Sequence, residues 1–384
     1  MKNLVDKKIK VLSLNHYIMG HSTYQNILEK TFSEYIPEVE FYSLHLTDYF
    51  KKDFLGRVGY WLLSKRLPGA EKSDYDLGRW RTELANSFFA RRCLDRVLKN
   101  YRPDVIHIHT QGIAYLVAPL FKQFPSVVSI DYTAALLATE HTAPARITYK
   151  PIIASERKCF AAASHIITWS ERARNSVIEH YAISPTKVTA IPPPAAGEFF
   201  SKLNPKQWAI QSNPRLLFVG NDFVRKGGED LIEVFLESFS DRASLDIVTN
   251  ASVDLPAEAN IRIHRGIRPL SPEMLQLYQN ADIFVMPTLE DVYGIVFIEA
   301  MAAGLPCIGT KVMAVPELVQ DGVNGLTIPP GSRAALRTAL SKLIDNPDLR
   351  ISMGQAGRKL AEEKFDARAN CQKIYQIFLH SLCQ

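Results

Sequence analysis

Residues 281–325 read ADIFVMPTLEDVYGIVFIEAMAAGLPCIGTKVMAVPELVQDGVNG. The short apolar run Ile283–Met286 is typical of a buried strand. An acidic loop follows it, and Ile295–Ala303 then has a helical pattern that ends at a glycine and a proline. Cys307–Gly309 predicts the next buried strand. The unit is therefore strand, acidic loop, helix and strand, which is typical of a parallel α/β sheet.

The acidic loop, Leu289–Ile295, lies where such sheets bind ligands. In a parallel α/β sheet, ligands lie outside the carboxyl ends of the strands. Backbone N–H groups near a helix N-terminus suit a phosphate or an oxygen-rich ligand. Asp291 in the loop and Glu299 in the helix can accept hydrogen bonds from the paired hydroxyls of a sugar or ribose. Both would be costly to bury without such a partner.

A second loop carries the opposite charge. Residues 215–220, RLLFVG, predict a strand, and Asp230–Phe239 predicts an amphipathic helix. Between them, the loop NDFVRKGG contains Arg225 and Lys226 at a strand-to-helix junction. Two cations beside helix-end N–H groups suit a diphosphate.

The block D-x-Y-G-I-V-x-x-E-A-M-A-x-G-x-P resembles the acidic signature of retaining, GT-B-type glycosyltransferases of family 4, usually E-x-F-G-x-x-x-x-E. Asp291 holds the position of the first Glu and Glu299 that of the second. Glu290 lies one residue early, so either it or Asp291 is implied to contact the donor sugar. The resemblance implies that Glu299 holds the ribose. The implied donor-binding residues here are Glu290, Tyr293, Gly294, Ile295, Val296 and Glu299, with Asp291 as a catalytic residue.

The family's G-x-x-x-x-x-K-G pattern matches Lys226 directly. Family members often carry an Arg just after the first Gly, where this chain has Asn221, so we assign that cation's role to Arg225. With these two cations against the diphosphate, no metal is expected, and no cofactor beyond a UDP-, GDP- or ADP-sugar donor.

The first half resembles the family more loosely. Its segment Val105–His109 is similar to a family D-V-x-H-x-H run, which implies that His109 touches the sugar as a catalytic residue and that His107 is buried. Gly20, in a predicted loop before a helix at residues 24–32, is implied to be donor-binding and to face the cleft with His21.

The resemblance implies two Rossmann-like, doubly wound α/β domains facing across a cleft, the GT-B fold. We expect an acceptor-side domain at residues 1–195, a nucleotide-sugar domain at 205–365 and a helix at 366–384 that returns to the first domain. Pro192 to Ala195 breaks regular structure between them, as a linker would.

Composition bounds the alternatives. The 384 residues are 47% hydrophobic and 22% charged, as in ordinary globular proteins. A net charge of +5 is too weak to indicate nucleic acid. The five cysteines show no metal-ligand spacing. No apolar run is long enough to span a bilayer, and the N-terminus lacks a signal-peptide core, so we expect a cytoplasmic location.

Residues 50–68, FKKDFLGRVGYWLLSKRLP, mix aromatic and aliphatic side chains with Lys and Arg. A basic helix with aromatics on one face can lie on an anionic membrane. A core-facing helix with a solvated basic face explains the same pattern, and both interpretations stay open.

The resemblance implies transfer of a hexose-type sugar from a nucleotide diphosphate to a hydroxyl of a glycan, a lipid-linked acceptor or a small molecule, with retention of anomeric configuration. Polysaccharide biosynthesis is one setting for such a reaction. A hydrolase or epimerase on the same donor and a non-catalytic nucleotide-sugar sensor or scaffold are the alternatives. A dinucleotide oxidoreductase is disfavoured, because the G-x-G-x-x-G fingerprint is absent.

Overall fold

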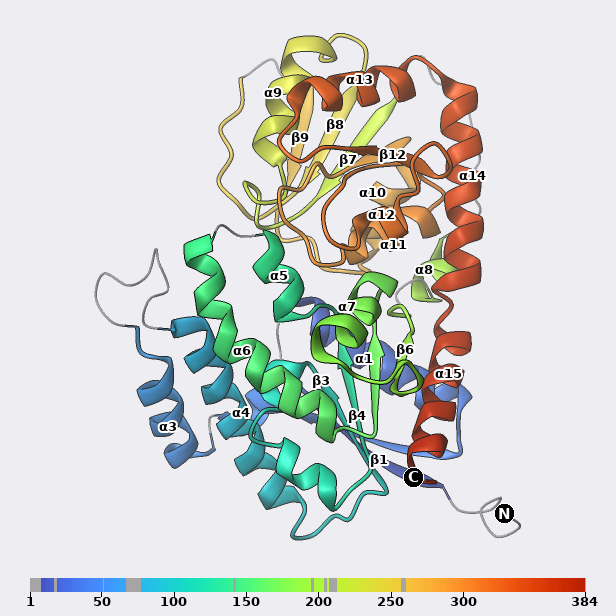
Figure 1. Cartoon of the computed structure of the whole chain (residues 1–384). Helices are drawn as coiled ribbons and strands as arrows, with labels where there is room; N and C mark the ends of the chain where they lie inside the picture. The colour runs from blue at the N-terminus through green and yellow to red at the C-terminus, as the bar shows by residue number, and fades with distance from the viewer. Residues whose placement is uncertain are drawn as a thin grey trace. The chain divides into compact units, whose positions relative to one another are not determined.

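The computed structural model describes residues 8–16, 19–50, 52–66, 77–140, 143–194, 197–203, 206, 213–256 and 260–383. The chain divides into two compact units. Unit 1 comprises Met1–Pro194 and Ala367–Gln384, and unit 2 comprises Ala195–Asp366. Each unit is built on a six-stranded parallel sheet with helices on both faces (Figure 1).

Unit 1 has the strand order β2-β1-β3-β4-β5-β6, so its topological switch point lies between β1 and β3. Its strands are β1 Ile9–Asn15, β2 Val39–His45, β3 Val105–His109, β4 Ser126–Ile130, β5 His165–Thr168 and β6 Val188–Ala190. Its helices are α1 Met19–Tyr35, α2 Leu46–Phe50, α3 Phe54–Ser64, α4 Gly78–Val97, α5 Ala134–Glu140, α6 Ala143–Ala162, α7 Glu171–Tyr181 and α15 Ala367–Ser381, with short 3-10 turns at Gln111–Ile113, Ala118–Lys122 and Pro185–Lys187.

Unit 2 has the order β12-β11-β10-β7-β8-β9, the Rossmann arrangement with its switch point between β7 and β10. Its strands are β7 Arg215–Val219, β8 Ser244–Val248, β9 Ile261–His264, β10 Ile283–Val285, β11 Cys307–Thr310 and β12 Gly325–Ile328. Its helices are α8 Gly197–Lys202, α9 Gly228–Ser238, α10 Pro272–Asn280, α11 Ile295–Ala302, α12 Val315–Leu318, α13 Arg333–Ile344 and α14 Pro347–Lys364.

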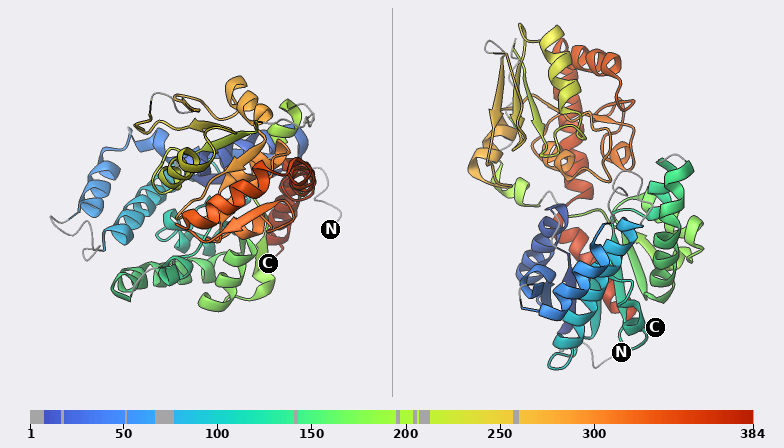
Figure 2. Two further views of the ribbon diagram at one scale, coloured as in Figure 1. Left: turned by 90° about the horizontal axis from the view of Figure 1, so that it is seen from above. Right: turned by 90° about the vertical axis from the view of Figure 1, so that its left-hand side faces the viewer.

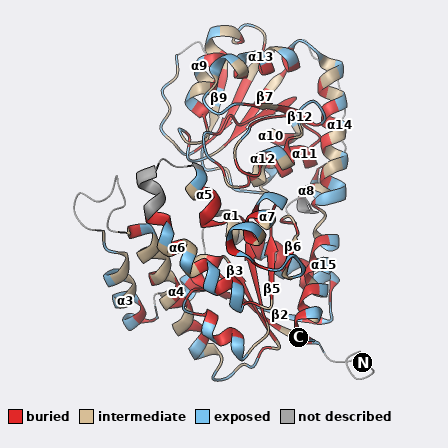
Figure 3. Ribbon diagram, in the orientation of Figure 1, coloured by how far each residue is buried: buried red, intermediate tan, exposed pale blue. Residues whose placement is uncertain are grey.

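The core of each unit is its central strands, which are buried on both faces because helices cover both sides (Figure 3). Every residue of β3, β4 and β10 is buried. Strand β10 is accordingly a continuous apolar run, whereas β3 and β4 also bury His and Ser side chains.

The last helix, α15, belongs to unit 1 although the chain reaches it after unit 2. It packs against α1 and β4 (Figure 2). The side-chain amide of Asn370 donates to the carbonyl of Pro192, 3.2 Å away, which ties the helix to the end of the first chain segment. No helix in the described part of the chain is long and apolar enough to cross a membrane.

Several element starts differ from the sequence prediction. Helix α1 begins at Met19, so Gly20 and His21 lie on a helix rather than in a loop. Helix α4 begins at Gly78, six residues before Leu84, where the sequence pattern predicts the helix to start. Helix α6 begins at Ala143, nine residues before Ile152, where the sequence pattern predicts the helix to start, and it contains Pro151. Residues 140–146, for which the sequence pattern predicts a loop on the acceptor side, are therefore mostly helical, with residues 141 and 142 outside the described chain.

Candidate functional site

The loop of unit 2 that carries Arg225 and Lys226 follows β7, on one side of the switch point. Its last residue, Gly227, has φ +75° and precedes α9. A Cβ placed there would lie 2.1 Å from the carbonyl oxygen of Pro287, which follows β10. Only glycine fits both the positive φ and the close approach. The two loops that flank the switch point therefore touch through their backbones.

Hydrogen bonds hold these two loops together. The backbone carbonyl of Arg225 accepts from the Leu289 N–H at 2.8 Å and from the Thr288 hydroxyl at 3.2 Å. The Arg225 guanidinium donates back to the carbonyl oxygen of Glu290 at 2.7 Å. The hydroxyl of Thr288 also donates to that carbonyl, at 2.9 Å. We call residues 221–228 and 286–294, joined in this way, the paired loops.

Ion pairs link the charges of the paired loops. The Lys226 ammonium contacts the Asp291 carboxylate, and both side chains are largely buried, 16% and 11% exposed. Arg225 Nε lies 2.6 Å from Asp222 Oδ2, and this hydrogen bond lowers the pKa of Asp222. Glu290 is exposed, and Arg225 contacts its backbone rather than its carboxylate. The two candidate acids thus differ: Asp291 is buried and neutralised, whereas Glu290 projects from the surface.

The start of α11 presents backbone amides beside these acids. Gly294 precedes the helix with φ +81°, and a Cβ there would lie 2.8 Å from the Phe297 ring. The first amides of the helix, those of Ile295 and Val296, have no intrahelical acceptor. Tyr293 is buried, and burial raises the pKa of its phenol. An anion or a hydroxyl-rich ligand at this helix end would meet unpaired N–H groups.

Glu299 lies one turn further into α11 and is half-buried. Burial raises the pKa of its carboxyl to about 7, although a hydrogen bond from Tyr278 opposes that shift. The Tyr278 hydroxyl donates to Glu299 Oε2 at 2.7 Å. Tyr278 itself is fully buried on α10, so it fixes the orientation of the carboxyl. Sequence reasoning missed this tyrosine, because no motif marks it.

At the corresponding switch point of unit 1, the side chains are imidazoles. His109 ends β3, and His21 lies on the first turn of α1, after β1. Their ring nitrogens, Nδ1 of His21 and Nε2 of His109, are 2.5 Å apart. His21 Nε2 lies 3.6 Å from Asp131 Oδ2. The structure thus brings His21, His109 and Asp131 together.

The direction of the hydrogen bonds follows from the acceptors. His109 Nδ1 faces the carbonyl oxygen of Ser129 at 3.1 Å, and a carbonyl only accepts, so this nitrogen carries the proton. Burial and the neighbouring imidazoles lower the pKa of His109 well below its usual value, so the ring is neutral. Its Nε2 therefore accepts from His21.

His109 has no exposed surface, so the structure does not support its predicted contact with a sugar. The ring of Trp169 stacks on it with centroids 5.1 Å apart, and Tyr24 covers another side at 4.7 Å. His107 is also fully buried, as expected. His21 is 16% exposed and is the imidazole of the pair that a ligand can reach. Gly20 lies in α1, but its burial and its contacts lie outside what the structure describes.

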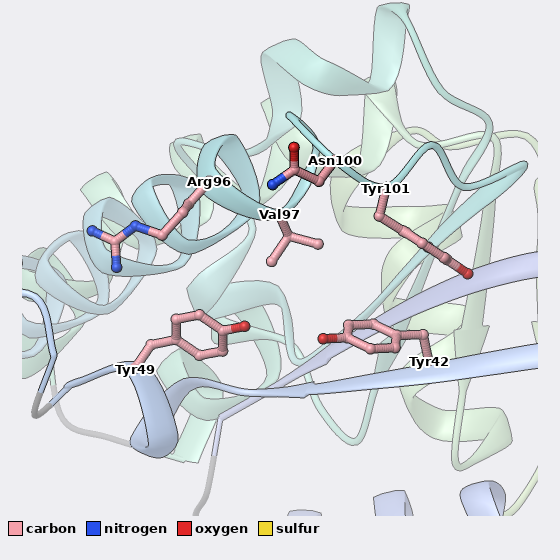
Figure 4. Close-up of a pocket in the computed structure, with 6 residues that line it drawn as sticks. All are labelled: Tyr42, Tyr49, Arg96, Val97, Asn100 and Tyr101. Carbon is pink, nitrogen blue, oxygen red and sulfur yellow. The ribbon is translucent and has the colours of Figure 1, made fainter.

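A separate surface pocket of about 330 Å³ lies in unit 1, away from all these residues (Figure 4). Tyr42 and Tyr49 point their hydroxyls toward one another below Val97 (Figure 4). Its other lining residues are Arg96, Asn100 and Tyr101. Within the described parts of the chain, no group of three or more His, Cys, Asp or Glu could hold a metal ion.

Comparison with known proteins agrees with these motifs. Residues 213–346 match the family model described as glycosyl transferases group 1, and residues 62–195 match that of glycosyltransferase family 4. The chain is 26% identical over 309 residues to a D-inositol 3-phosphate glycosyltransferase of Corynebacterium aurimucosum, covering 73% of this chain and 72% of that protein.

Solved structures show the same fold. Sucrose-phosphate synthase from Thermosynechococcus elongatus superimposes with a TM-score of 0.71 over 97% of this chain and 99% of that chain, at 16% identity. HepE from Anabaena, in complex with UDP and glucose, gives a TM-score of 0.64 over 96% of this chain and 99% of that chain, at 15% identity. With its matched sequence models and two Rossmann-like units, the chain belongs to the family-4 glycosyltransferases and has the GT-B fold.

Proposed function

We propose that this glycosyltransferase moves a hexose-type sugar from a nucleotide diphosphate donor to a hydroxyl acceptor, with retention of anomeric configuration. The observation that carries the proposal is the buried contact between Lys226 and Asp291 across the switch point of unit 2. It puts a cation for phosphate and an acid for hydroxyl groups side by side. HepE, a protein of the same fold, has been crystallised with UDP and glucose, which supports a donor of this type.

The charge requirement of the reaction fits the paired loops. When the glycosidic bond of such a donor breaks, the leaving nucleoside diphosphate gains negative charge, which must be stabilised. Lys226, Arg225 and the N–H groups at the start of α11 supply fixed positive charge and donors for that purpose. We therefore propose that the diphosphate lies against this side of the paired loops and that the reaction needs no metal.

The acids would hold the hydroxyl groups of the donor. Glu299, oriented by Tyr278 through Oε2, would accept a ribose hydroxyl with its other carboxylate oxygen. Asp291 and the Gly294–Val296 backbone would hold the sugar, and exposed Glu290 would reach it only from the outer side of the loop. In unit 1, we assign the substrate contact to His21 in place of His109, because His21 keeps exposed surface. We propose that the protein acts in the cytoplasm.

A two-stage experiment tests this function. Thermal-shift measurements with UDP, GDP and ADP, and with their sugars, should find a base that raises the melting temperature, because a bound ligand stabilises the folded state. Labelled sugar donor is then incubated with a panel of glycan, lipid-linked and small-molecule acceptors, with and without EDTA. Sugar attached to an acceptor in both conditions supports the proposal, and the anomeric configuration of that product tests retention.

Other products would identify the alternatives. Sugar released to water would indicate a hydrolase, and an isomerised donor an epimerase. Donor binding without turnover across the acceptor panel would indicate a sensor or scaffold. For variants that remove the positive charge of Lys226, Lys359→Gln is the matched control. Lys359 is 78% exposed on α14 and belongs to no part of the proposed site.

A further inference from the structure

Helix α3 exposes an unusual row of large apolar side chains. Phe54, Leu55, Trp61 and Leu62 are 58–68% exposed, and Val58 between them is 39% exposed. The spacing of these residues, i, i+1, i+4, i+7 and i+8, puts them on one face of an α-helix. We call these five residues the apolar face of α3. The helix lies at the outside of unit 1, alongside α4 (Figures 1 and 2).

The opposite side of α3 packs closely on α4. A Cβ at Gly56 would lie 2.8 Å from the Phe89 ring, and a Cβ at Gly59 would lie 2.5 Å from the Phe88 ring. Glycines thus face the core of unit 1, while the large side chains face outward. Of the two interpretations left open for residues 50–68, the core-facing helix is therefore wrong, because the large apolar side chains of α3 face outward.

Positive charge surrounds the apolar face. Among the described residues 52–66 the only acid is Asp53, which is buried and accepts two hydrogen bonds from Arg92, at 2.7 and 2.9 Å. Its charge is therefore neutralised, and α3 itself contains no acid. Arg57 lies over the Phe54 ring at 5.9 Å, and Lys65 over the Trp61 ring at 5.0 Å. The long basic side chains flank the aromatic rings, as they do in helices that lie at a lipid interface.

We propose that α3 docks the protein onto an anionic membrane surface, with its apolar face in the headgroup region and its cations on the lipid phosphates. An aromatic and aliphatic face framed by Lys and Arg is complementary to such a surface in both hydrophobicity and charge. A second copy of this chain is the poorer partner, because a symmetric contact through the same face would bring like charges together. Arg96, in the last turn of α4, lines the pocket of Figure 4, contacts Asp53 just before α3 and extends the positive surface.

Vesicle sedimentation of the full chain tests the proposal. The protein should sediment with vesicles of equal parts phosphatidylcholine and phosphatidylglycerol, and much less with pure phosphatidylcholine. The double variant Trp61→Glu/Leu62→Glu should lose more than about tenfold in vesicle affinity, because two charges would enter the lipid interface. Val323→Glu, at a residue that is 54% exposed in unit 2, is the matched control and should bind like the wild type.

The electrostatic part has its own pair of variants. Arg57→Gln with Lys65→Gln should weaken binding to the anionic vesicles by about fivefold per cation removed. Lys342→Gln with Lys359→Gln removes the same charge from exposed positions of unit 2 and should leave vesicle binding unchanged. If both pairs weaken binding equally, net charge rather than α3 attracts the protein, and the proposal is overturned.

Fluorescence locates the contact. Emission should shift to the blue when anionic vesicles are added, as Trp61 leaves water. Trp61→Phe, which keeps an apolar ring, should remove most of the shift while the protein still sediments with vesicles. An unchanged shift would overturn the proposal. The proposal would also be overturned if the wild-type chain did not bind vesicles but associated with itself through α3. Analytical ultracentrifugation would show this as an oligomer for the wild type and a monomer for Leu62→Glu.

Vesicle binding requires no nucleotide-sugar, so these experiments give the same answer whether or not the chain transfers a sugar. If α3 binds the bilayer, and the proposed transfer reaction holds, the acceptor class favoured for this enzyme is a lipid-linked hydroxyl. Adding acceptor-bearing anionic vesicles should then raise the turnover of the wild type but not that of Trp61→Glu/Leu62→Glu. Each variant is first checked for an unchanged melting temperature, so that loss of folding is not mistaken for loss of docking.

Discussion

The two units place different chemistry at the same topological position. At the switch point of unit 2, between β7 and β10, Lys226 contacts Asp291, and charges dominate. At the switch point of unit 1, between β1 and β3, His21 contacts His109 beneath Trp169, and aromatic rings dominate. The fold thus supplies two equivalent positions, and the side chains decide what each can bind.

The difference explains why one position is easier to recognise than the other. Charged groups at a buried position need partners at fixed spacing. The charged residues at the switch point of unit 2 therefore form a motif that can be recognised in the sequence. Imidazoles packed among aromatic rings can be satisfied in many ways. Whether such a ring is buried or accessible then depends on neighbours far away in sequence, such as Trp169 and Tyr24.

The largest effect is expected from Lys226→Ala. We expect donor affinity to fall by about 100-fold, because a charge-assisted contact with the diphosphate is lost. The variant should also lose about 3 kcal/mol of stability, since Asp291 would be left buried without its partner. Titration of the nucleoside diphosphate and denaturant unfolding measure the two effects.

A double variant separates these two effects. Lys226→Met/Asp291→Asn removes both charges and should regain most of the stability while donor binding stays weak. If Lys226→Ala instead bound donor like the wild type, the paired loops would lose their assignment as the phosphate site, and the comparison between the units would need a different basis.

The next effect tests the close approach of the paired loops. Gly227→Ala should cost more than about 2 kcal/mol of stability, because the methyl group would meet the Pro287 carbonyl at a positive φ. Gly266→Ala is the control, since Gly266 also has φ +69° but no atom within 4 Å of the added Cβ. It should cost only about 1 kcal/mol. Equal losses, measured by denaturant unfolding, would show that backbone conformation and not loop contact makes Gly227 necessary.

The acid on α11 should make donor binding depend on pH. The ionised carboxylate of Glu299 is a stronger acceptor for a ribose hydroxyl than the neutral carboxyl, and its pKa is raised to about 7. Donor affinity should therefore fall as the pH drops through about 7 and level off only about one pH unit above that value. Glu299→Gln should bind about tenfold more weakly at pH 8 and lose the pH dependence. Calorimetric titrations between pH 5.5 and 8.5 (about one and a half units to either side of the pKa) measure this pH dependence.

The smallest effect separates the two histidines of unit 1. His21→Gln should lower kcat/KM about fivefold through loss of one hydrogen bond to substrate, with stability nearly unchanged. His109→Gln should instead destabilise unit 1, because the buried ring packs between Tyr24 and Trp169. Steady-state kinetics and thermal unfolding of both variants distinguish these outcomes. A drop in turnover for His109→Gln at unchanged stability would restore the role first assigned to it.

The strands and the charged loops could be predicted from the sequence because each obeys a local rule. Residues 283–285 form β10 within the predicted strand Ile283–Met286, and α11 starts at the predicted Ile295. The GT-B fold and the family assignment were likewise confirmed. Helix starts were less predictable, since Pro151 sits inside α6 where tertiary packing outweighs its local preference. Strand β12 was not predicted, because its four residues follow a run of turn formers.

Within the site, the sequence pointed to the charged residues but not to what orients them. Tyr278, Thr288 and Trp169 belong to no motif, and each acts through a contact with a residue distant in the chain. The roles proposed for Arg225, Lys226, Asp291 and Glu299 remain predictions for the measurements above.

The contact of Lys226 with Asp291 has a kinetic consequence. Any anion that reaches the ammonium must compete with a carboxylate already in place, and the carboxylate is free to return when that anion departs. On the proposed function, such an exchange would shorten the residence time of the nucleoside diphosphate after the glycosidic bond has broken. An internal competitor of this kind would allow the enzyme to bind a highly charged leaving group strongly and still release it.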